Sequence, residues 1–381
     1  MNIDNLRIEI FKNFDDAGLR TSWTRIADKD GYFVQNSFEW CNIWWKYYNK
    51  NKDLYILTVF HNDQIIAIAP FYLEKKFVFS ILKFIGSGFT DYHQILVSKD
   101  YNYHAIAQRI FEYLTSFAKW DYIYLEQIND GDLLYSFFDK RIDFQKKFLI
   151  ECLIGELKYK SFNDFLKDLK KSERHKYIRL IKRLEEKGEL RLIKIIDSIN
   201  FNKYFDALIN LHNKRWNNIP GTTKLRVKLN LLFLRDVFVK MFELNKAVLY
   251  MLTLDNELIS YILGFIENQQ FYSWNTSFDI EFHKYSPGTI IIALIIKDII
   301  ENGKSLNCYK YNHMRGGYDY KKKLIPVGNM LKNFLFLSHK KNLKGFILNL
   351  YYFWIRDLTK RKFKKLIENK SFRLILGLDK K

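Results

Sequence analysis

The chain has 381 residues, 48% hydrophobic and 27% charged, so it holds enough apolar material for packed cores and lacks the composition of a disordered protein. Its 62 Lys and Arg against 42 Asp and Glu give a net charge of +20, which favours anionic partners: a phosphorylated cofactor, a nucleic acid or an acidic membrane face. Three scattered cysteines, eight histidines without paired spacing and the lack of P-loop, dinucleotide-binding or nucleophile-elbow motifs argue against a disulfide framework, a metal site and those enzyme classes.

The first half of the chain predicts a hairpin, a helix and a strand. Two β-rich runs over residues 54–73 are split by a His-Asn-Asp turn, which is typical of a β-hairpin. A helical pattern over residues 103–118 then precedes a strand at 122–125.

Between hairpin and helix, the loop Gly-Ser-Gly-Phe-Thr-Asp-Tyr-His at 86–93 follows a further strand. Asp91 or His93 could act there as a base toward a hydroxyl or an amine. The alternative is a loop that an aspartate caps.

A basic helical segment is predicted over residues 162–187. Tyr177, Ile181 and Leu184 fall on one face at helical spacing, and lysines and arginines lie mostly on the other. The basic face is either a solvated surface or a surface for phosphates or an acidic ligand.

The second half repeats the order of the first, about 190 residues later. The pentapeptide at 54–58 recurs at 249–253, and the second hairpin over 249–266 leads to a strand at 271–276, a helix at 288–301 and a strand at 308–311. We therefore predict an α/β protein with tandem duplicated domains, each a mixed sheet flanked by helices. Two unrelated α/β halves are the alternative.

The second half also holds the strongest ligand signal. Ser286, Gly288 and Thr289 open an apolar helix, and free N–H groups at a helix start can bind phosphate where glycine allows close approach. The corresponding position of the first half, residues 98–102, has an aspartate and no glycine. Ser-Pro-Gly is also an ordinary way to begin a helix.

A second cluster, residues 312–323, follows the last strand of this half and combines glycines, tyrosines and lysines. Tyr320 could donate a proton to a leaving thiolate, and Arg315 and Lys321 could hold an anion. The alternative is a glycine turn with surface lysines.

The tail, residues 341–381, mixes aromatic residues with basic clusters and is predicted to be helical. Residues 331–381 hold 14 basic and 3 acidic residues, a net +11, which suits a helix at an anionic membrane surface. A terminal helix packed on the second domain is the alternative. The longest apolar runs, 289–296 and 345–355, are shorter than the about 20 residues of a membrane span, and the start of the chain lacks a signal-peptide core. We therefore expect a cytoplasmic protein. The membrane interpretation of the tail adds peripheral contact at the inner face of the membrane.

Short motifs along residues 30–325 occur in an order that resembles one protein family. They are Asn36 to Trp40 with Trp44, residues 66–70 and 84–86, Asp91-Tyr92, Arg174, Arg179, residues 182–184, Gly188, Leu211-His212, Arg215-Trp216, residues 286–288 and residues 316–321. The chain resembles the two-domain GNAT-fold acetyltransferases of the CelD-like type, relatives of the Fem peptidoglycan aminoacyl transferases. It departs from the family pattern at Asn312 and Tyr318, where the family has an aspartate and a glutamate.

The resemblance implies transfer of an acyl group, usually acetyl from acetyl-CoA, to an amine or hydroxyl of a sugar or cell-envelope precursor, with no metal. The pyrophosphate would lie at Ser286, Gly288 and Thr289, and the thioester against the strand at Trp274, Asn275 and Thr276. Asp91 and Tyr320 would be catalytic. The acceptor would enter a cleft between the halves, and its predicted contacts are Tyr92, His93, Arg215, Arg315 and Lys321.

The resemblance leaves two other functions open. A Fem-type transferase would take an aminoacyl group from tRNA, whose phosphates suit the basic charge. A non-catalytic protein would use a decayed pair of domains to bind an anionic polymer or membrane. The predicted boundaries are 1–157 and 158–340 for the two domains, the second carrying the linking helix and acyl-CoA site, and 341–381 for the tail.

Overall fold

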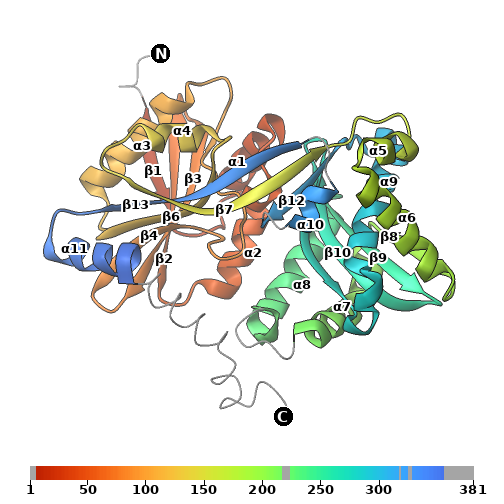
Figure 1. The fold of residues 1–381 in the computed structure, drawn as a ribbon. Helices are drawn as coiled ribbons and strands as arrows, with labels where there is room; N and C mark the ends of the chain where they lie inside the picture. Colours follow the sequence, from red (N-terminus) through yellow and green to blue (C-terminus); the bar gives the residue numbers. More distant parts are fainter. Residues whose placement is uncertain (1–5, 217–223, 317–318, 325–327, 356–381) are drawn as a thin grey trace, which may run out of the picture. The chain divides into compact units, whose positions relative to one another are not determined.

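The structure, a computed structural model, describes residues 6–216, 224–316, 319–324 and 328–355 (Figure 1). The chain divides into two compact units. Unit 1 consists of residues 1–149 and 333–381, and unit 2 of residues 150–332. Two strands, β7 (Gln145–Glu156) and β13 (Gly328–His339), contribute residues to both units.

Unit 1 is built on a mixed sheet in the order β1-β2-β3-β4-β6-β13. The predicted hairpin is confirmed as β2 (Lys52–His61) and β3 (Gln64–Lys76), and its turn residues Asn62 and Asp63 adopt φ of 47° and 59°, as a tight hairpin turn requires. The other strands are β1 (Arg7–Phe11), β4 (Phe79–Phe84), the short β5 (Leu96–Val97) beside β3, and β6 (Tyr122–Asn129), which pairs in parallel with β4.

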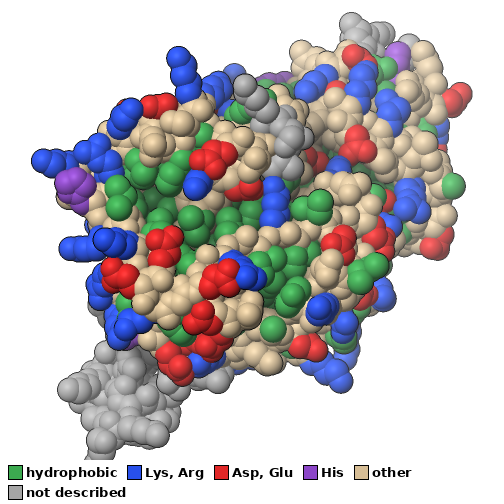
Figure 2. Space-filling model, turned by 90° about the vertical axis from the view of Figure 1, so that its right-hand side faces the viewer, with side chains coloured by type: hydrophobic (Ala, Val, Ile, Leu, Met, Phe, Trp, Pro, Cys, Tyr) green, Lys and Arg blue, Asp and Glu red, His purple; other side chains and the backbone are tan. Residues whose placement is uncertain are grey.

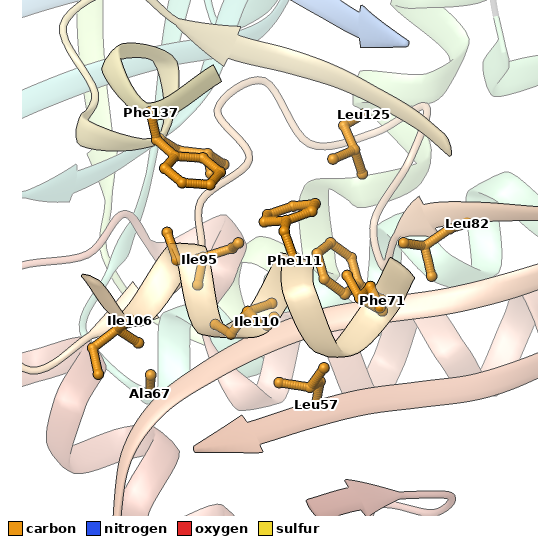
Figure 3. Close-up of a cluster of buried hydrophobic side chains, with 14 of the residues drawn as sticks. Leu57, Ala67, Phe71, Leu82, Ile95, Ile106, Ile110, Phe111, Leu125 and Phe137 are labelled. Atoms are coloured by element: carbon orange, nitrogen blue, oxygen red, sulfur yellow. The ribbon is translucent and has the colours of Figure 1, made fainter. Parts of the chain in front are cut away.

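One face of this sheet packs on α3 (Tyr103–Phe117) and α4 (Leu133–Asp139). Successive residues of a strand point to opposite faces, and alternate side chains such as Leu57, Phe71 and Leu125 meet Ile110 and Phe111 of α3 in a buried cluster (Figure 3). Asn102 caps α3 by accepting from the Ala105 N–H at 3.0 Å. The other helices of unit 1 are α1 (Ala17–Asp30), the 3-10 turn η2 (Val34–Asn36) and α2 (Phe38–Tyr48).

The opposite face of the same sheet carries α2 and the described part of the tail, α11 (Leu343–Asn349) and η5 (Leu350–Ile355). Trp44 of α2 lies 5.2 Å from the ring of Tyr72, the neighbour of Phe71 that points to this side. Leu348 and Tyr352 of the tail pack with Ile81 and Tyr122 in a second buried cluster. Each face of the sheet is therefore covered by its own set of aromatic and aliphatic side chains.

Unit 2 contains a sheet in the order β7-β12-β11-β10-β9-β8. The second predicted hairpin is confirmed as β9 (Ala247–Leu254) and β10 (Glu257–Glu267), with Asp255 and Asn256 at φ of 48° and 68°. The remaining strands are β8 (Leu190–Ile195), β11 (Gln270–Phe278) and β12 (Lys310–Arg315). The β11–β12 pair is parallel and the other pairs given by register are antiparallel.

Helices cover both faces of this sheet. On one side, α9 (Pro287–Leu306), α5 (Phe162–Asp168) and α6 (Lys171–Glu185) share a core with Ile262 and Tyr250. On the other side, α7 (Ser198–Trp216) and α8 (Lys228–Glu243) pack on Phe265, whose ring is stacked 5.0 Å from Phe238. Short pieces complete the unit: η3 (Lys224–Arg226), η4 (Ile280–Tyr285) and α10 (Asp319–Lys323).

The single basic helix predicted over 162–187 is wrong in one respect, because two helices occupy it. Leu169 and Lys170 adopt extended ψ angles of 148° and 136° and separate α5 from α6. On α6 the predicted faces are found: Tyr177 and Leu184 are buried, Ile181 is partly buried, and Arg179, Lys182 and Arg183 are exposed.

The units also differ from the predicted domain boundaries at 157/158 and 340/341. Residues 333–339 pair with β6 in the sheet of unit 1, and the described tail packs on the same unit, so the tail belongs to unit 1 rather than to the second domain. Residues 356–381 lie outside the described part of the chain. Basic and acidic side chains intermingle on the surface shown in Figure 2, so the positive excess does not form a single patch on that face.

Candidate active site

The parallel pair β11–β12 opens partway along unit 2. The two strands pair at Gln270↔Lys310, Phe271↔Tyr311 and Tyr272↔Asn312, and within the described residues their ladder ends there. Beyond this point β11 stays paired with β10 as far as Phe278, while β12 continues beside β7. The part of β11 that follows Tyr272 therefore leaves its parallel neighbour, in the region where the sequence predicted the thioester.

A β-bulge lies in the same part of β11. Leu263 pairs with Asn275 and Gly264 with Ser273, so Trp274 is the additional residue of the bulged strand. Gly264 is required opposite it, because a Cβ atom there would lie 2.1 Å from the Tyr272 carbonyl oxygen. Bulges redirect the groups beside them, and the predicted cofactor residues Trp274, Asn275 and Thr276 are all half-buried at this bend.

The connection from β11 to α9 is held by the last turn of α7. Lys214 Nζ lies 2.8 Å from Asp279 Oδ2 and 2.9 Å from Glu281 Oε1. Asp279 also caps η4 by accepting from the Glu281 N–H, and its own N–H donates to the Ile259 carbonyl oxygen. The hydrogen bonds that Lys214 donates to Asp279 and Glu281 raise the pKa of its ammonium group, which stays charged. This clamp fixes the loop that leads into the predicted phosphate site.

The opening turn of α9 offers fewer donors than the sequence suggested. Ser286 adopts a left-handed conformation with φ of 54°, and its carbonyl oxygen accepts from the N–H groups of Thr289 and Ile290 at 2.9 and 3.2 Å. Pro287 has no N–H. The Gly288 N–H is thus the remaining backbone donor of this turn among the described residues. A Cβ atom at Gly288 would lie 3.1 Å from the Phe278 ring, so a side chain there would press on that ring.

A cation also lies against Phe278. The Arg215 guanidinium carbon is 4.0 Å from the centre of the Phe278 ring and 4.8 Å from that of Trp216. Arginine stacked on aromatic rings keeps its fork of N–H donors directed for carboxylate or phosphate groups. Arg215, predicted to bind the acceptor, is therefore placed by the structure beside the helix opening predicted to bind the donor.

A hydrogen-bonded chain leads from the bulge to His212 of α7. The Tyr261 hydroxyl donates to Asn275 Oδ1 at 2.7 Å and lies 3.4 Å from His212 Nδ1. Burial, with the nearby charges of Arg215 and Arg226, lowers the pKa of His212 to about 4, so the imidazole is neutral at pH 7. Burial also raises the pKa of Tyr261, which keeps its proton.

Sequence reasoning gave His212 and Tyr261 no role. The signal for His212 was its position three residues before Arg215, which places both on one side of a helix. Tyr261 carried no such signal, because the alternation of β10 marks it only as a residue facing α7 and α8.

At the end of β12, the structure uses Lys321 internally. Its ammonium is buried and donates to the carbonyl oxygens of His313 and Arg315 at 2.9 and 3.0 Å, which ties α10 to the strand. This geometry supports a structural role rather than the predicted substrate contact. Arg315 is half-buried at the strand end, and the side chain of Tyr320 lies outside the described part of the structure, as does Tyr318.

The site residues predicted in the first half, Asp91, Tyr92 and His93, are buried in unit 1. Asp91, Tyr92 and His93 are 2%, 5% and 1% exposed. The Asp91 N–H donates to Gln35 Oε1 at 2.7 Å, and its carbonyl oxygen accepts from Asn333 Nδ2 at 2.7 Å. This burial favours the alternative, a structural loop. These three residues belong to unit 1 and Arg215 to unit 2, so the shared acceptor cleft stays a prediction.

Unit 1 holds a pocket of its own, of about 430 Å³, on the sheet face that carries α2 and the tail. Aromatic side chains of α2 and η5 line it together with charged residues of the sheet. Two of its lysines interact with neighbouring side chains. Lys83 Nζ lies 2.5 Å from Glu74 Oε2 in an ion pair, and Lys76 Nζ lies 5.6 Å from the centre of the Tyr351 ring. Among the described residues, no group of three or more His, Cys, Asp or Glu side chains is arranged to hold a metal.

Sequence comparison finds a family likeness in the second unit. Residues 171–322 match the family described as "Acetyltransferase (GNAT) domain". This stretch of the chain is similar to GNAT domains. The matched range runs from the start of α6 to α10 and includes the bulged strand, the α9 opening and Arg215. No curated protein sequence matches the chain significantly.

Solved structures extend the likeness over both units. FemX superposes with a TM-score of 0.58 at 9% identity, over 85% of this chain and 96% of that one. A tandem GNAT protein from the clavulanic acid biosynthesis pathway gives 0.51 at 10% identity, over 88% and 99%. L-PGS from Bacillus licheniformis gives 0.51 at 13% identity, over 91% and 99%. At these identities the likeness shows the fold, and with the domain match it supports the predicted tandem GNAT-like architecture and a GNAT-type transferase.

Proposed function

We propose that unit 2 catalyses acyl transfer from a thioester donor, acetyl-CoA or another acyl-CoA. The observation that carries this proposal is the bulge at Trp274, located where β11 leaves β12. A backbone N–H released from the ladder at such a bend can polarise a thioester carbonyl while the acceptor attacks it. The chain's contribution is then orientation and charge stabilisation, without a covalent enzyme intermediate.

Two kinds of hydrogen-bond donor would bind the phosphates of the acyl-CoA. Gly288 supplies a backbone N–H at the start of α9, and Arg215 supplies a guanidinium braced by Phe278 and Trp216. Because only one amide of the helix turn remains, Arg215 provides most of the positive charge in this proposal. Ser286 and Thr289 border the same turn as hydroxyl donors.

The acid and base assignments rest on the sequence. Tyr320 is proposed as the acid that protonates the leaving thiolate, and the burial of Asp91 does not support its proposed role as the base. We propose a sugar or cell-envelope precursor as the acceptor, modified at an amine or hydroxyl. The finer CelD-like assignment and a cytoplasmic location remain predictions from the sequence.

A specific observation supports a second kind of acyl donor, an aminoacyl-tRNA. The α9 opening is a poorer phosphate site than expected, and FemX and L-PGS share the fold. The alternative proposal is therefore transfer of an aminoacyl group from tRNA, whose backbone would be met by the basic surface of the chain.

Calorimetry with acetyl-CoA and CoA tests the first proposal. We expect micromolar binding by the wild-type chain and loss of at least about tenfold in Arg215→Met, because a guanidinium hydrogen-bonded to an anion contributes about 1.5–3 kcal/mol. The matched control is Arg191→Met, an exposed arginine of β8 that pairs with Glu189.

If acetyl-CoA does not bind at millimolar concentration, the acyl-CoA proposal is wrong. Transfer that depends on aminoacylated tRNA would then establish the alternative. If the chain neither binds acetyl-CoA nor transfers an aminoacyl group from tRNA, the non-catalytic function is supported.

A further inference from the structure

The described tail presents an apolar face to solvent on unit 1. Leu343, Phe346, Ile347, Leu350 and Tyr351 are 75%, 55%, 45%, 39% and 40% exposed. Their spacing of three and four residues places them on one side of a helix. We call these five residues the tail face.

The other side of the same helix is buried. Gly345, Leu348 and Tyr352 lie against unit 1, where the Tyr122 and Tyr352 rings are stacked 5.3 Å apart. Asn342 fixes the start of α11 by accepting from the Gly345 N–H at 2.8 Å. The tail is therefore a docked helix with two apolar sides, of which packing on unit 1 uses only one.

A hairpin tip lies beside the tail face. Lys344 Nζ donates to the Val78 carbonyl oxygen at 3.0 Å, and Lys76 Nζ is 5.6 Å from the Tyr351 ring centre. In this β3–β4 turn, Phe77 is 95% exposed and Val78 is 66% exposed. Two elements far apart in the sequence thus bring large apolar side chains to one region of the surface of unit 1.

The charged residues in the described part of the tail and just before it are all lysines. From residue 333 to residue 355 the sequence holds three lysines, at 340, 341 and 344, and no Asp or Glu. Lys75 and Lys76 directly precede the hairpin tip, and Lys75 Nζ also lies 3.2 Å from Asp53 Oδ2. Apolar side chains with lysines at their border match the interface of an anionic bilayer, where the apolar groups reach the acyl boundary and the ammonium groups meet lipid phosphates.

We propose that the tail face and the hairpin tip dock unit 1 onto an anionic membrane surface. This inference does not depend on the transfer reaction. It concerns peripheral binding, and no helix among the described residues is long and apolar enough to cross a bilayer. Tyr351 and Lys76 also line the pocket of unit 1, so docking would bring the wall of that pocket to the lipid headgroups.

Co-sedimentation of the full chain with vesicles tests the proposal. We expect binding to phosphatidylglycerol-containing vesicles, little binding to pure phosphatidylcholine, and release at high salt. Replacing Phe346 and Ile347 together by Asp should weaken binding about tenfold or more, because two apolar side chains no longer enter the interface. Both side chains are largely exposed, so the fold should persist, which circular dichroism would check.

The matched control is Ile142→Asp, because Ile142 is a fully exposed apolar residue of unit 1 in another loop. This variant should bind as the wild type does. Binding of the Phe346/Ile347 variant equal to wild type would assign any membrane affinity to other residues and overturn the proposal. Failure of the wild type to bind, together with a dimer in sedimentation equilibrium that the same variant dissociates, would overturn it in favour of a second copy of the chain.

Discussion

His212 shows how a single buried side chain couples stability to pH. Its pKa is about 4 in the folded chain, below the ordinary 6.5, because burial and Arg215 disfavour the imidazolium. The unfolded chain therefore binds a proton first as pH falls, so this contribution to stability is complete above pH 6.5 and is lost between pH 6.5 and 4. We expect His212→Gln to flatten the pH dependence of the free energy of unfolding over this window. Urea titrations at several pH values measure it, with the exposed His283→Gln as the control; an unchanged slope would contradict the assignment.

Lys321 is the residue at which the structural and ligand-binding interpretations differ most. Lys321→Met removes the donor from two carbonyl oxygens near the end of β12, and we expect a loss of roughly 1–3 kcal/mol in the free energy of unfolding. Lys322→Met removes only a partly exposed pair with Glu151 and should cost less than about 1 kcal/mol. Chemical denaturation compares the two variants. A stable Lys321→Met chain with weakened ligand binding would instead support the role predicted from the sequence.

Residue types alone could not settle which charged groups face solvent. Asp91 and Lys321 were selected because carboxylates and ammonium groups near glycines often act on ligands, yet their main-chain and side-chain partners come from Gln35, Asn333, His313 and Arg315. The partners of Asp91 come from distant segments of the chain, whereas those of Lys321 lie close in sequence but depend on how α10 folds back on β12. One ring that Arg215 contacts, Trp216, is its neighbour in the sequence, but the other, Phe278, lies 63 residues further along the chain.

At the scale of elements, local patterns were sufficient where one segment decides its own conformation. Both hairpins followed from Asn/Asp turns between β-rich runs, and α9 begins at the predicted Ser-Pro-Gly. The break between α5 and α6 has neither Pro nor Gly to mark it, since it lies at Leu169 and Lys170. The bulge in β11 could not be predicted from the sequence either, because a bulge is defined by the register of the strand against its partner.

Gly264 makes the bulge testable as an element. Gly264→Ala would place a methyl group 2.1 Å from the Tyr272 carbonyl oxygen, so β10 and β11 must separate locally. We expect a loss of roughly 1–3 kcal/mol in the free energy of unfolding and weaker donor binding. Thermal unfolding and calorimetry provide the two measurements. Gly18→Ala in α1, where the nearest atom is a side-chain oxygen at 3.2 Å, is the control and should be close to neutral; equal behaviour of the two variants would show that the bulge tolerates a Cβ atom.

At the scale of the whole molecule, the assignment of residues to units depends on contacts across most of the chain. The duplication could be predicted because each half repeats the same order of elements. The position of β13 could not, since it pairs with β6 about two hundred residues earlier and no local pattern names that partner. Unit 1 is consequently discontinuous in sequence, whereas unit 2 is one continuous stretch, and the two should respond differently to truncation.

A chain ending at Lys332 should lose unit 1 and keep unit 2. Removing residues 333–381 takes away the strand beside β6 and the buried side chains Leu335, Leu337, Leu348 and Tyr352 that cover Ile81 and Tyr122. The core of unit 2 lies entirely within residues 153–330, so it survives this cut. We expect limited proteolysis of the truncated chain to degrade residues 1–149 and to leave a protected fragment near 150–332, and we expect that fragment, expressed alone, to unfold cooperatively. Protection of residues 1–149 in the truncated chain would show that β13 and the tail are dispensable to unit 1, and the discontinuous unit would then be wrong.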